Sequence, residues 1–170
     1  TALMVTHDQN EAFAMADRVG VMHQGQIQQW DTAYNVYHRP SNRFVADFVG
    51  MGAFLPGRVL NSQEVSIELG VLQGIIPTQC GAANCDPCVY DCQVDVLIRP
   101  DDVIYDDASA IQANVIKKAF RGADFLYTLQ LASGAQILSL VPSHHDHALG
   151  EPIGIALAAD HVVVFPRAVI

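Results

Sequence analysis

The chain has 170 residues, of which 51% are hydrophobic, and this suits one large domain or two small ones with a substantial core. Its net charge is −9, and its nine Lys and Arg residues never form a run longer than Lys117-Lys118, which argues against binding to nucleic acids or anionic membrane surfaces. No apolar run approaches the roughly 20 residues of a membrane-spanning helix, and no secretory leader is visible.

The first fifty residues predict short strands and helices. The apolar run ALMVT (residues 2–6) is typical of a buried strand, and Asp8 is placed to cap the helix that follows. A domain rarely opens with a central strand that has no partner, so we expect the chain to be the tail of a longer protein. The expected elements are a strand over 2–6, a helix over 9–16, a hairpin from 18 to 30 turning at Gly25, a helix over 33–37 capped by Asp31 or Thr32, and a helix within 42–50 capped by Ser41.

The pattern changes after Gly52 to short apolar runs separated by turn residues, glycine above all. Many short strands at close spacing are typical of a barrel or a sandwich. We therefore expect a boundary near residue 52 and a mainly β second domain over 53–170. The expected strands are 55–60, 64–69, 71–76, 93–99, 113–120, 125–131, 136–141, 152–157 and 162–165.

Two stretches of the sequence resemble a known family. The first is MVTHDQNEAFAMADRVGVMHQGQIQQWDTAYNVYHRPSNRFVADFVG (residues 4–50), which is similar to the end of the nucleotide-binding domain of an ABC importer ATP-binding subunit. The second is VLIRPDDV (residues 96–103), which resembles the arginine-proline motif of the C-terminal regulatory domain in the same group. The resemblance implies an α/β tail of the nucleotide-binding domain over 1–52 and a small barrel-type, oligosaccharide-binding-like (OB-like) regulatory domain over 53–170.

The resemblance also implies a function. Such a subunit couples ATP hydrolysis, with Mg²⁺, to uptake, and it works with inner-membrane permease subunits and a periplasmic binding protein. It lies peripherally on the cytoplasmic face of the bacterial inner membrane and forms a homodimer through the barrel domains. The stretches KKAFRGADFLYTLQL, LVPSHHDHALGE and DHVVVF look most like the ferric iron type.

Several parts of the ATPase are missing from the sequence. There is no GxxxxGK[ST] phosphate loop, no LSGGQ-like signature and no aliphatic run ending in Asp-Glu before His7. We therefore expect this chain to be a C-terminal fragment that does not hydrolyse ATP by itself. Without the rest of the nucleotide-binding domain, the strands over 2–6 and 19–22 lose their sheet neighbours, so we expect them to be frayed, swapped or paired with a second copy.

His7 is the candidate catalytic residue. By resemblance it is the switch histidine, which contacts the γ-phosphate of ATP and orients the attacking water in the intact subunit. Phosphoryl transfer depends on positioning and charge stabilisation, and an imidazole at the end of a strand can reach a phosphate. The alternative is a polar loop histidine without a role.

All four cysteines fall within thirteen residues, in the stretch CGAANCDPCVYDC (residues 80–92). Four clustered thiolates could hold zinc or an iron–sulfur cluster, and the first three have the spacing of plant-type ferredoxin loops. Redox-sensing thiols and ordinary loop cysteines are the alternatives. The candidate ligands are Cys80, Cys85, Cys88 and Cys92.

Two further motifs carry polar side chains. SHHDH (residues 143–147) is interpreted as a polar turn between strands, or alternatively as a regulatory cation site completed by Asp101 or Asp102. In IRPDDV, Arg99 and Asp101 are interpreted as structural, because Pro100 ends a strand and the carboxylates can cap the turn that follows.

Two other classes of protein are alternatives to the transport ATPase. An independent metal- or small-molecule-sensing module would use the cysteines and the histidine run as its site. A free-standing enzyme is disfavoured, because the sequence has no nucleophile elbow, metalloprotease helix or paired-carboxylate site.

Overall fold

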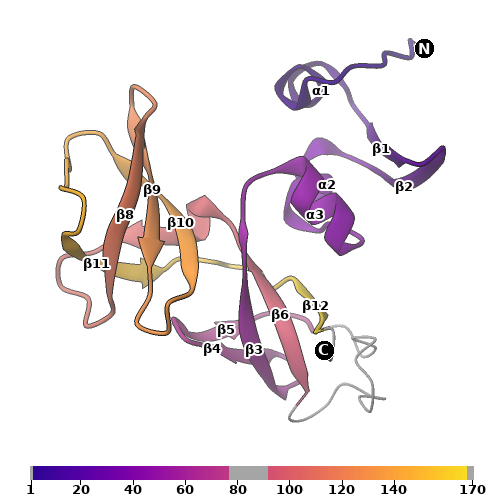
Figure 1. Ribbon diagram of the computed structural model, residues 1–170. Helices are drawn as coiled ribbons and strands as arrows, with labels where there is room; N and C mark the ends of the chain where they lie inside the picture. Colours follow the sequence, from indigo (N-terminus) through magenta and orange to yellow (C-terminus); the bar gives the residue numbers. More distant parts are fainter. Residues whose placement is uncertain (1, 77–91, 168–170) are drawn as a thin grey trace. The chain divides into compact units, whose positions relative to one another are not determined.

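The computed structural model describes residues 2–76 and 92–167 of the chain (Figure 1). These residues form two compact units, Thr1–Gly50 and Met51–Ile170. Each unit has its own buried cluster of apolar side chains, so each is described by itself.

The N-terminal unit is a hairpin with three short helices, as the sequence predicts. Its buried centre is a valine cluster of Val21, Val36, Val45 and Val49, in which the hairpin contributes the first and the last two helices the others. Its elements are α1 (Gln9–Met15), β1 (Val19–His23), β2 (Gln26–Asp31), α2 (Ala33–His38) and α3 (Arg43–Val49).

Side-chain caps begin the three helices. Asp8 accepts hydrogen bonds from the N–H groups of Asn10 and Glu11, and Thr32 accepts one from Asn35. The cap of α3 is Asn42, whose side-chain oxygen accepts from the N–H of Val45 at 2.9 Å, so the prediction of Ser41 as the cap is wrong. Ser41 instead donates its hydroxyl to the carbonyl oxygen of Gln28.

The strand expected over residues 2–6 does not form in this chain. The segment is extended but is not paired with any other described strand, and Leu3 and Val5 are exposed. A strand needs a neighbour for its backbone hydrogen bonds, and none reaches this segment. The expectation that the stretch 19–22 would be frayed, swapped or paired with a second copy is wrong, because β1 pairs antiparallel with β2 of the same chain, from Val19 opposite Asp31 to His23 opposite Gln26.

The C-terminal unit is built from strands, with one 3₁₀ turn, η1 (Pro100–Asp102). The predicted strands all appear, with shifted ends, and β7 is an additional strand that the sequence analysis missed. The strands are β3 (Ala53–Asn61), β4 (Glu64–Ile67), β5 (Gly70–Gln73), β6 (Gln93–Ile98), β7 (Val103–Tyr105), β8 (Gln112–Phe120), β9 (Asp124–Gln130), β10 (Gln136–Pro142), β11 (Pro152–Leu157) and β12 (Val164–Pro166).

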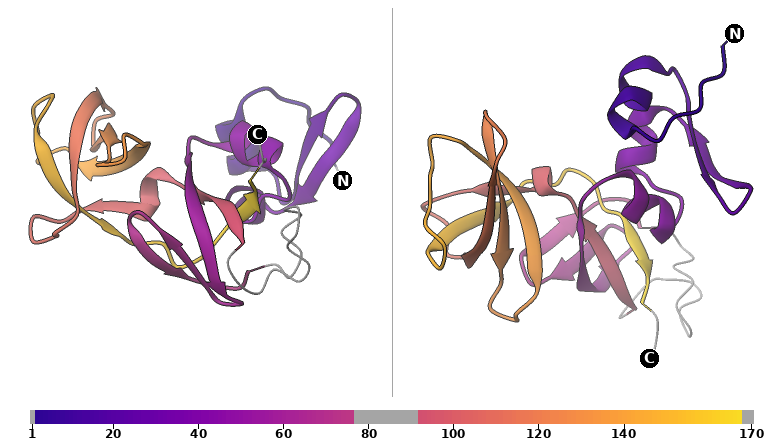
Figure 2. Two further views of the ribbon diagram at one scale, coloured as in Figure 1. Left: turned by 60° about the horizontal axis from the view of Figure 1, so that its bottom comes forward. Right: turned by 45° about the horizontal axis from the view of Figure 1, so that its top comes forward.

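Five of these strands form a curved, nearly closed sheet in the order β10-β9-β8-β11-β7 (Figure 2). Its two edge strands meet, since the hydroxyl of Ser139 on β10 donates a hydrogen bond of 2.6 Å to the carbonyl oxygen of Val103 on β7. A sheet that closes on itself leaves few unpaired backbone groups at its edges.

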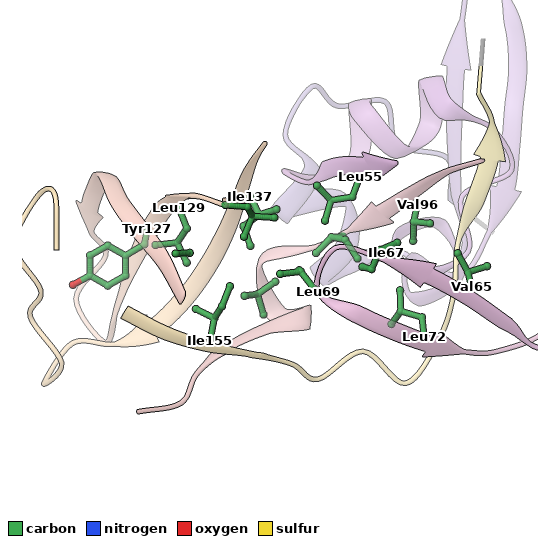
Figure 3. Close-up of a cluster of buried hydrophobic side chains, with 14 of the residues drawn as sticks. Leu55, Val65, Ile67, Leu69, Leu72, Val96, Tyr127, Leu129, Ile137 and Ile155 are labelled. Atoms are coloured by element: carbon green, nitrogen blue, oxygen red, sulfur yellow. The ribbon is translucent and has the colours of Figure 1, made fainter. Parts of the chain in front are cut away.

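The other five strands form a second antiparallel sheet in the order β12-β6-β3-β4-β5. Glycine is required in β3, where a Cβ on Gly57 would lie 2.6 Å from a methyl group of Val96. One continuous core connects the two sheets, and Figure 3 shows side chains from both of them meeting in it. Labelled members are Leu55, Val65, Ile67, Leu69, Leu72, Val96, Tyr127, Leu129, Ile137 and Ile155.

A polar contact between turns also joins the sheets. Glu68, in the turn between β4 and β5, accepts hydrogen bonds from the backbone N–H of Ser133, at 2.9 Å, and from its hydroxyl. Ser133 lies in the turn between β9 and β10, so this carboxylate fixes two hairpin ends that are far apart in the sequence.

Candidate functional site

His7 lies in the extended segment before α1 and is exposed to solvent. The residues around it are ordered by local hydrogen bonds, since Thr6 donates to Glu11 at 2.6 Å and accepts from the N–H of Asp8 at 3.0 Å. An exposed imidazole beside a helix start is available to a ligand, so the assigned role of His7 remains a prediction.

The cysteine stretch is described only at its end. Cys92, next to β6, is buried, with 3% of its surface exposed, and takes part in a disulfide bond. Cys80, Cys85 and Cys88 lie outside the described residues. A metal at this stretch would need the thiolate form of Cys92, so the metal hypothesis remains a prediction about the reduced protein.

The histidine run belongs to the connection between β10 and β11 (residues 143–151), which a buried tyrosine holds in place. Tyr127 on β9 is completely buried. Its hydroxyl donates to the carbonyl oxygen of His145 at 3.0 Å and accepts from the backbone N–H of His147 at 3.0 Å. The connection is thus attached to the sheet through its backbone, which leaves its side chains available for other contacts.

Two polar side-chain contacts hold this connection. Lys118 on β8 contacts Asp146 at 2.6 Å, and this hydrogen bond raises the pKa of the lysine. His147 contacts Glu151 through its Nδ1 at 2.9 Å. That hydrogen bond, together with one from the N–H of Ala148, lowers the pKa of Glu151.

Tyr105 at the end of β7 completes an aromatic cluster. Its ring lies 4.7 Å from the ring of His145 and 4.8 Å from that of His147, between centroids. Its hydroxyl donates to Asp107, and this hydrogen bond raises the pKa of Tyr105 to about 12. At neutral pH Tyr105 is therefore a neutral phenol beside the two histidine rings.

The polar groups of this cluster bind one another rather than a common centre. In residues 2–76 and 92–167, no three His, Cys, Asp or Glu side chains are arranged to hold a metal ion. Asp102, suggested as a possible partner of SHHDH, is engaged elsewhere, because it accepts a hydrogen bond of 2.7 Å from the backbone N–H of Arg99. The arrangement supports the interpretation of SHHDH as a polar connection.

The turn of IRPDDV is a buried structural element. Arg99 is 1% exposed and Asp102 is 5% exposed, and the Asp102 carboxylate accepts a hydrogen bond from the backbone N–H of Arg99 at the start of η1. The guanidinium of Arg99 also donates to the carbonyl oxygen of Met51, at 3.3 Å. Arg99 thus fixes the start of the C-terminal unit, and Asp102, rather than Asp101, is the capping carboxylate.

An open groove of about 600 Å³ lies beside the edge strand β5. We call it the β5 groove. It was not visible in the sequence, because its walls come from three separate parts of the chain. The first part is at β5, the second is in the segment before β8, and the third is at and after the end of β11. The lining residues are Leu69, Val71, Leu72, Gln73, Ser109, Ile111, Ala156, Leu157, Ala159 and Asp160.

The aromatic cluster, too, was only partly predictable. The histidine run was visible as a motif, but Tyr105, Tyr127 and Glu151 come from three different strands or their ends. A tyrosine within a predicted strand gives no signal that its hydroxyl reaches a loop eighteen residues away.

Comparison with known proteins gives a family match for part of the chain. Residues 96–165, from within β6 to within β12, match the family model of the TOBE domain. About 67% of the chain also superposes on 95% of the molybdate-binding protein ModG with a TM-score of 0.51 at 13% identity. This likeness shows the fold alone, and it confirms the predicted mainly β, OB-like architecture.

The particular relatives are import ATP-binding proteins. The chain is 32% identical over 169 residues to the spermidine/putrescine import ATP-binding protein PotA 1 of Pseudomonas aeruginosa, covering 96% of this chain and 45% of the relative. The protein PotA of Rubrobacter xylanophilus is 31% identical over 172 residues, again 96% of this chain and 45% of the relative. PotA of Trichormus variabilis is 33% identical over 150 residues, which cover 84% of this chain and 39% of the relative.

The chain thus spans a little under half the length of these relatives. The predicted resemblance to importer ATP-binding subunits is confirmed at this level, whereas the inclination toward the ferric iron type is not supported. No helix among the described residues has the length and apolar character needed to cross a membrane.

Proposed function

We propose that this chain is the C-terminal part of the ATP-binding subunit of an ABC importer for polyamines. The observation that carries the proposal is the 32% identity to a spermidine/putrescine import ATP-binding protein over 169 residues, which includes both units of the chain. A match to the TOBE domain alone would say much less, because one fold hosts many functions.

The N-terminal unit supports the same proposal through its surface. Apolar side chains that a small independent domain would bury are exposed there, and they suit packing against further parts of a larger ATPase. The most exposed of them are Leu3, Val5, Met15, Met22, Ile27 and Tyr34.

In the intact subunit, His7 would act on ATP. Its exposed imidazole would contact the γ-phosphate and orient the attacking water, with Mg²⁺ and the phosphate loop supplied by other parts of the protein. The chain described by this sequence would contribute this one histidine to the reaction. ATP and Mg²⁺ are therefore cofactors of the intact subunit only.

The proposed partners follow from the same class. The subunit would lie peripherally on the cytoplasmic face of the inner membrane and work with permease subunits that receive cargo from a periplasmic binding protein. It would form a homodimer, and the C-terminal unit would serve regulation and dimerisation. A metal- or small-molecule-sensing module is the alternative, and three of its candidate ligands, Cys80, Cys85 and Cys88, lie outside the described residues.

The test is ATP hydrolysis by the full-length subunit, reconstituted with its permease in proteoliposomes. We expect stimulation by the binding protein loaded with spermidine or putrescine, and loss of that stimulation in His7→Ala. Stimulation by the binding protein loaded with ferric iron, without a response to polyamines, would overturn the assignment of cargo. Unchanged hydrolysis in His7→Ala would overturn the assigned role of the histidine.

A further inference from the structure

We propose that two copies of this chain associate by inserting the tip of the β8–β9 hairpin of one copy into the β5 groove of the other. The hairpin tip is defined by Lys117, Phe120 and Arg121, and the groove is the one beside β5 described above. The inference rests on the proposed homodimer and adds the two surfaces through which the copies meet.

The tip presents an apolar side chain on a fixed hairpin. Phe120 is the last residue of β8 and is 69% exposed. Its backbone is held opposite Phe125 of β9, and the hairpin is closed by a hydrogen bond of 2.8 Å from the N–H of Arg121 to the carbonyl oxygen of Asp124. An exposed phenyl ring on such an ordered hairpin loses little conformational freedom when a partner covers it.

The tip is also positively charged in an acidic unit. Residues 51–170 carry thirteen Asp and Glu but only six Lys and Arg, and three of these six are Lys117, Lys118 and Arg121. Lys118 is paired with Asp146. Among the described residues, no ion pair joins Lys117 or Arg121 to a carboxylate. Arg121 directly follows Phe120, and Lys117 lies three residues before it on β8, so both cations can meet the carboxylates of a partner.

The β5 groove has the complementary character. Apolar side chains line part of it, among them Leu72, Ile111 and Leu157, and Val71 of the edge strand is 51% exposed. The side chain of Asp160 lines it and is 90% exposed, although it also contacts His161. No Lys or Arg is among the residues that line the groove. A volume of about 600 Å³ is ample for a phenyl ring.

The partner is assigned as a second copy because this chain supplies both halves of the contact. Arg121 of one copy would lie at Asp160 of the other while Phe120 fills the apolar part of the groove. In a two-fold arrangement each copy gives one tip and one groove, so the contact is made twice and the assembly closes at two chains.

The test uses sedimentation equilibrium of the 170-residue chain and two charge-reversal variants, Arg121→Glu and Asp160→Lys. Each variant alone places like charges in both contacts, so we expect its dimer to be at least about tenfold weaker than that of the wild type. Mixing the two variants restores opposite charges in both contacts of the mixed pair, so we expect a heterodimer of wild-type affinity.

Two further variants complete the design. Phe120→Ser removes the apolar insertion and should also weaken the dimer about tenfold or more. Leu149→Ser is the matched control, since Leu149 is 64% exposed on the same unit but belongs to neither the tip nor the groove. Circular dichroism and the thermal midpoint of each variant show whether it is folded.

Three results would overturn the proposal. They are a monomeric wild type, a dimer that both charge reversals leave intact, and a mixture of the two variants that stays monomeric. The measurement needs no nucleotide, permease or cargo. A dimer formed through other surfaces would therefore overturn this inference alone and leave the proposed transport function untouched.

Discussion

Ser139 and Val103 hold the two edges of the curved sheet together. They are 36 residues apart in sequence, yet the Ser139 hydroxyl donates to the Val103 carbonyl at 2.6 Å inside the core. Ser139 is completely buried. Burying a hydroxyl in an apolar core is costly unless it has a hydrogen-bond partner. The hydrogen bond between Ser139 and Val103 meets this need and joins the two edge strands of the sheet.

Ser139→Ala should destabilise the C-terminal unit. The change leaves the buried carbonyl of Val103 without this donor, at a cost of about 1–3 kcal/mol in the free energy of unfolding. Urea denaturation at equilibrium measures the loss. Ser62→Ala, at an exposed serine in the turn between β3 and β4, is the control. Equal stabilities of the two variants would show that the hydrogen bond contributes nothing.

Gly154→Ala should be more damaging than an alanine at another glycine of the same unit. A Cβ on Gly154 would lie 2.1 Å from the carbonyl oxygen of Asp106, which is backbone and cannot turn aside. We expect a loss of about 3 kcal/mol or more in the free energy of unfolding. Gly74→Ala is the comparison, because its Cβ would meet Val162 at 3.0 Å or more. A mild effect at Gly154 would mean that β7 and β11 separate easily.

Glu151→Gln should lower stability at neutral pH and have less effect in acid. The hydrogen bonds from His147 and Ala148 lower the pKa of Glu151 below its usual value of 4.5 in the folded chain. The contribution of the ionised Glu151 to the free energy of unfolding is therefore present above its unfolded pKa. That contribution is lost as pH falls through its folded pKa. Thermal midpoints measured between neutral and acid pH should converge for wild type and variant. Asp124→Asn is the control, and a constant gap would contradict the prediction.

Tyr105 should titrate at higher pH than an ordinary tyrosine. Its hydrogen bond to Asp107 favours the neutral phenol, which raises the pKa to about 12. Asp107→Asn removes the charged acceptor, so the pKa should fall toward the ordinary value of 10.0. NMR of protein labelled at the tyrosine Cζ, titrated through the alkaline range, reads this directly. An unchanged titration in Asp107→Asn would assign the shift to another cause.

The cysteine hypothesis predicts a metal in the reduced protein. Anaerobic purification followed by metal and sulfide analysis should give about one zinc per chain, or the absorption of an iron–sulfur cluster. The matched variant is Cys92→Ser, which removes the one described ligand and should reduce the metal content. Four reactive thiols without metal would leave only the redox and loop interpretations of residues 80–92.

Local features were the most predictable from the sequence. The cap at Asp8 and the β1–β2 hairpin were predicted correctly, and Thr32 was one of the two caps proposed for α2, because a cap or a tight turn is decided by neighbouring residues. The strand over 2–6 was not, because a strand depends on a partner that local sequence does not supply. The short strand β7 was missed for a similar reason, since its three residues follow the turn at Pro100 and are defined by pairing with β11.

The sequence alone indicated the resemblance to importer ATP-binding subunits, the mainly β C-terminal unit and the histidine run, because periodicity, turn residues and family motifs are all local patterns. Only the tertiary structure decided that Tyr127 holds the connection after β10, that Ser139 closes the sheet, and that a groove opens beside β5. Each of these features joins segments that are distant along the chain. Their contacts depend on how the sheets curve and pack, which no local pattern specifies.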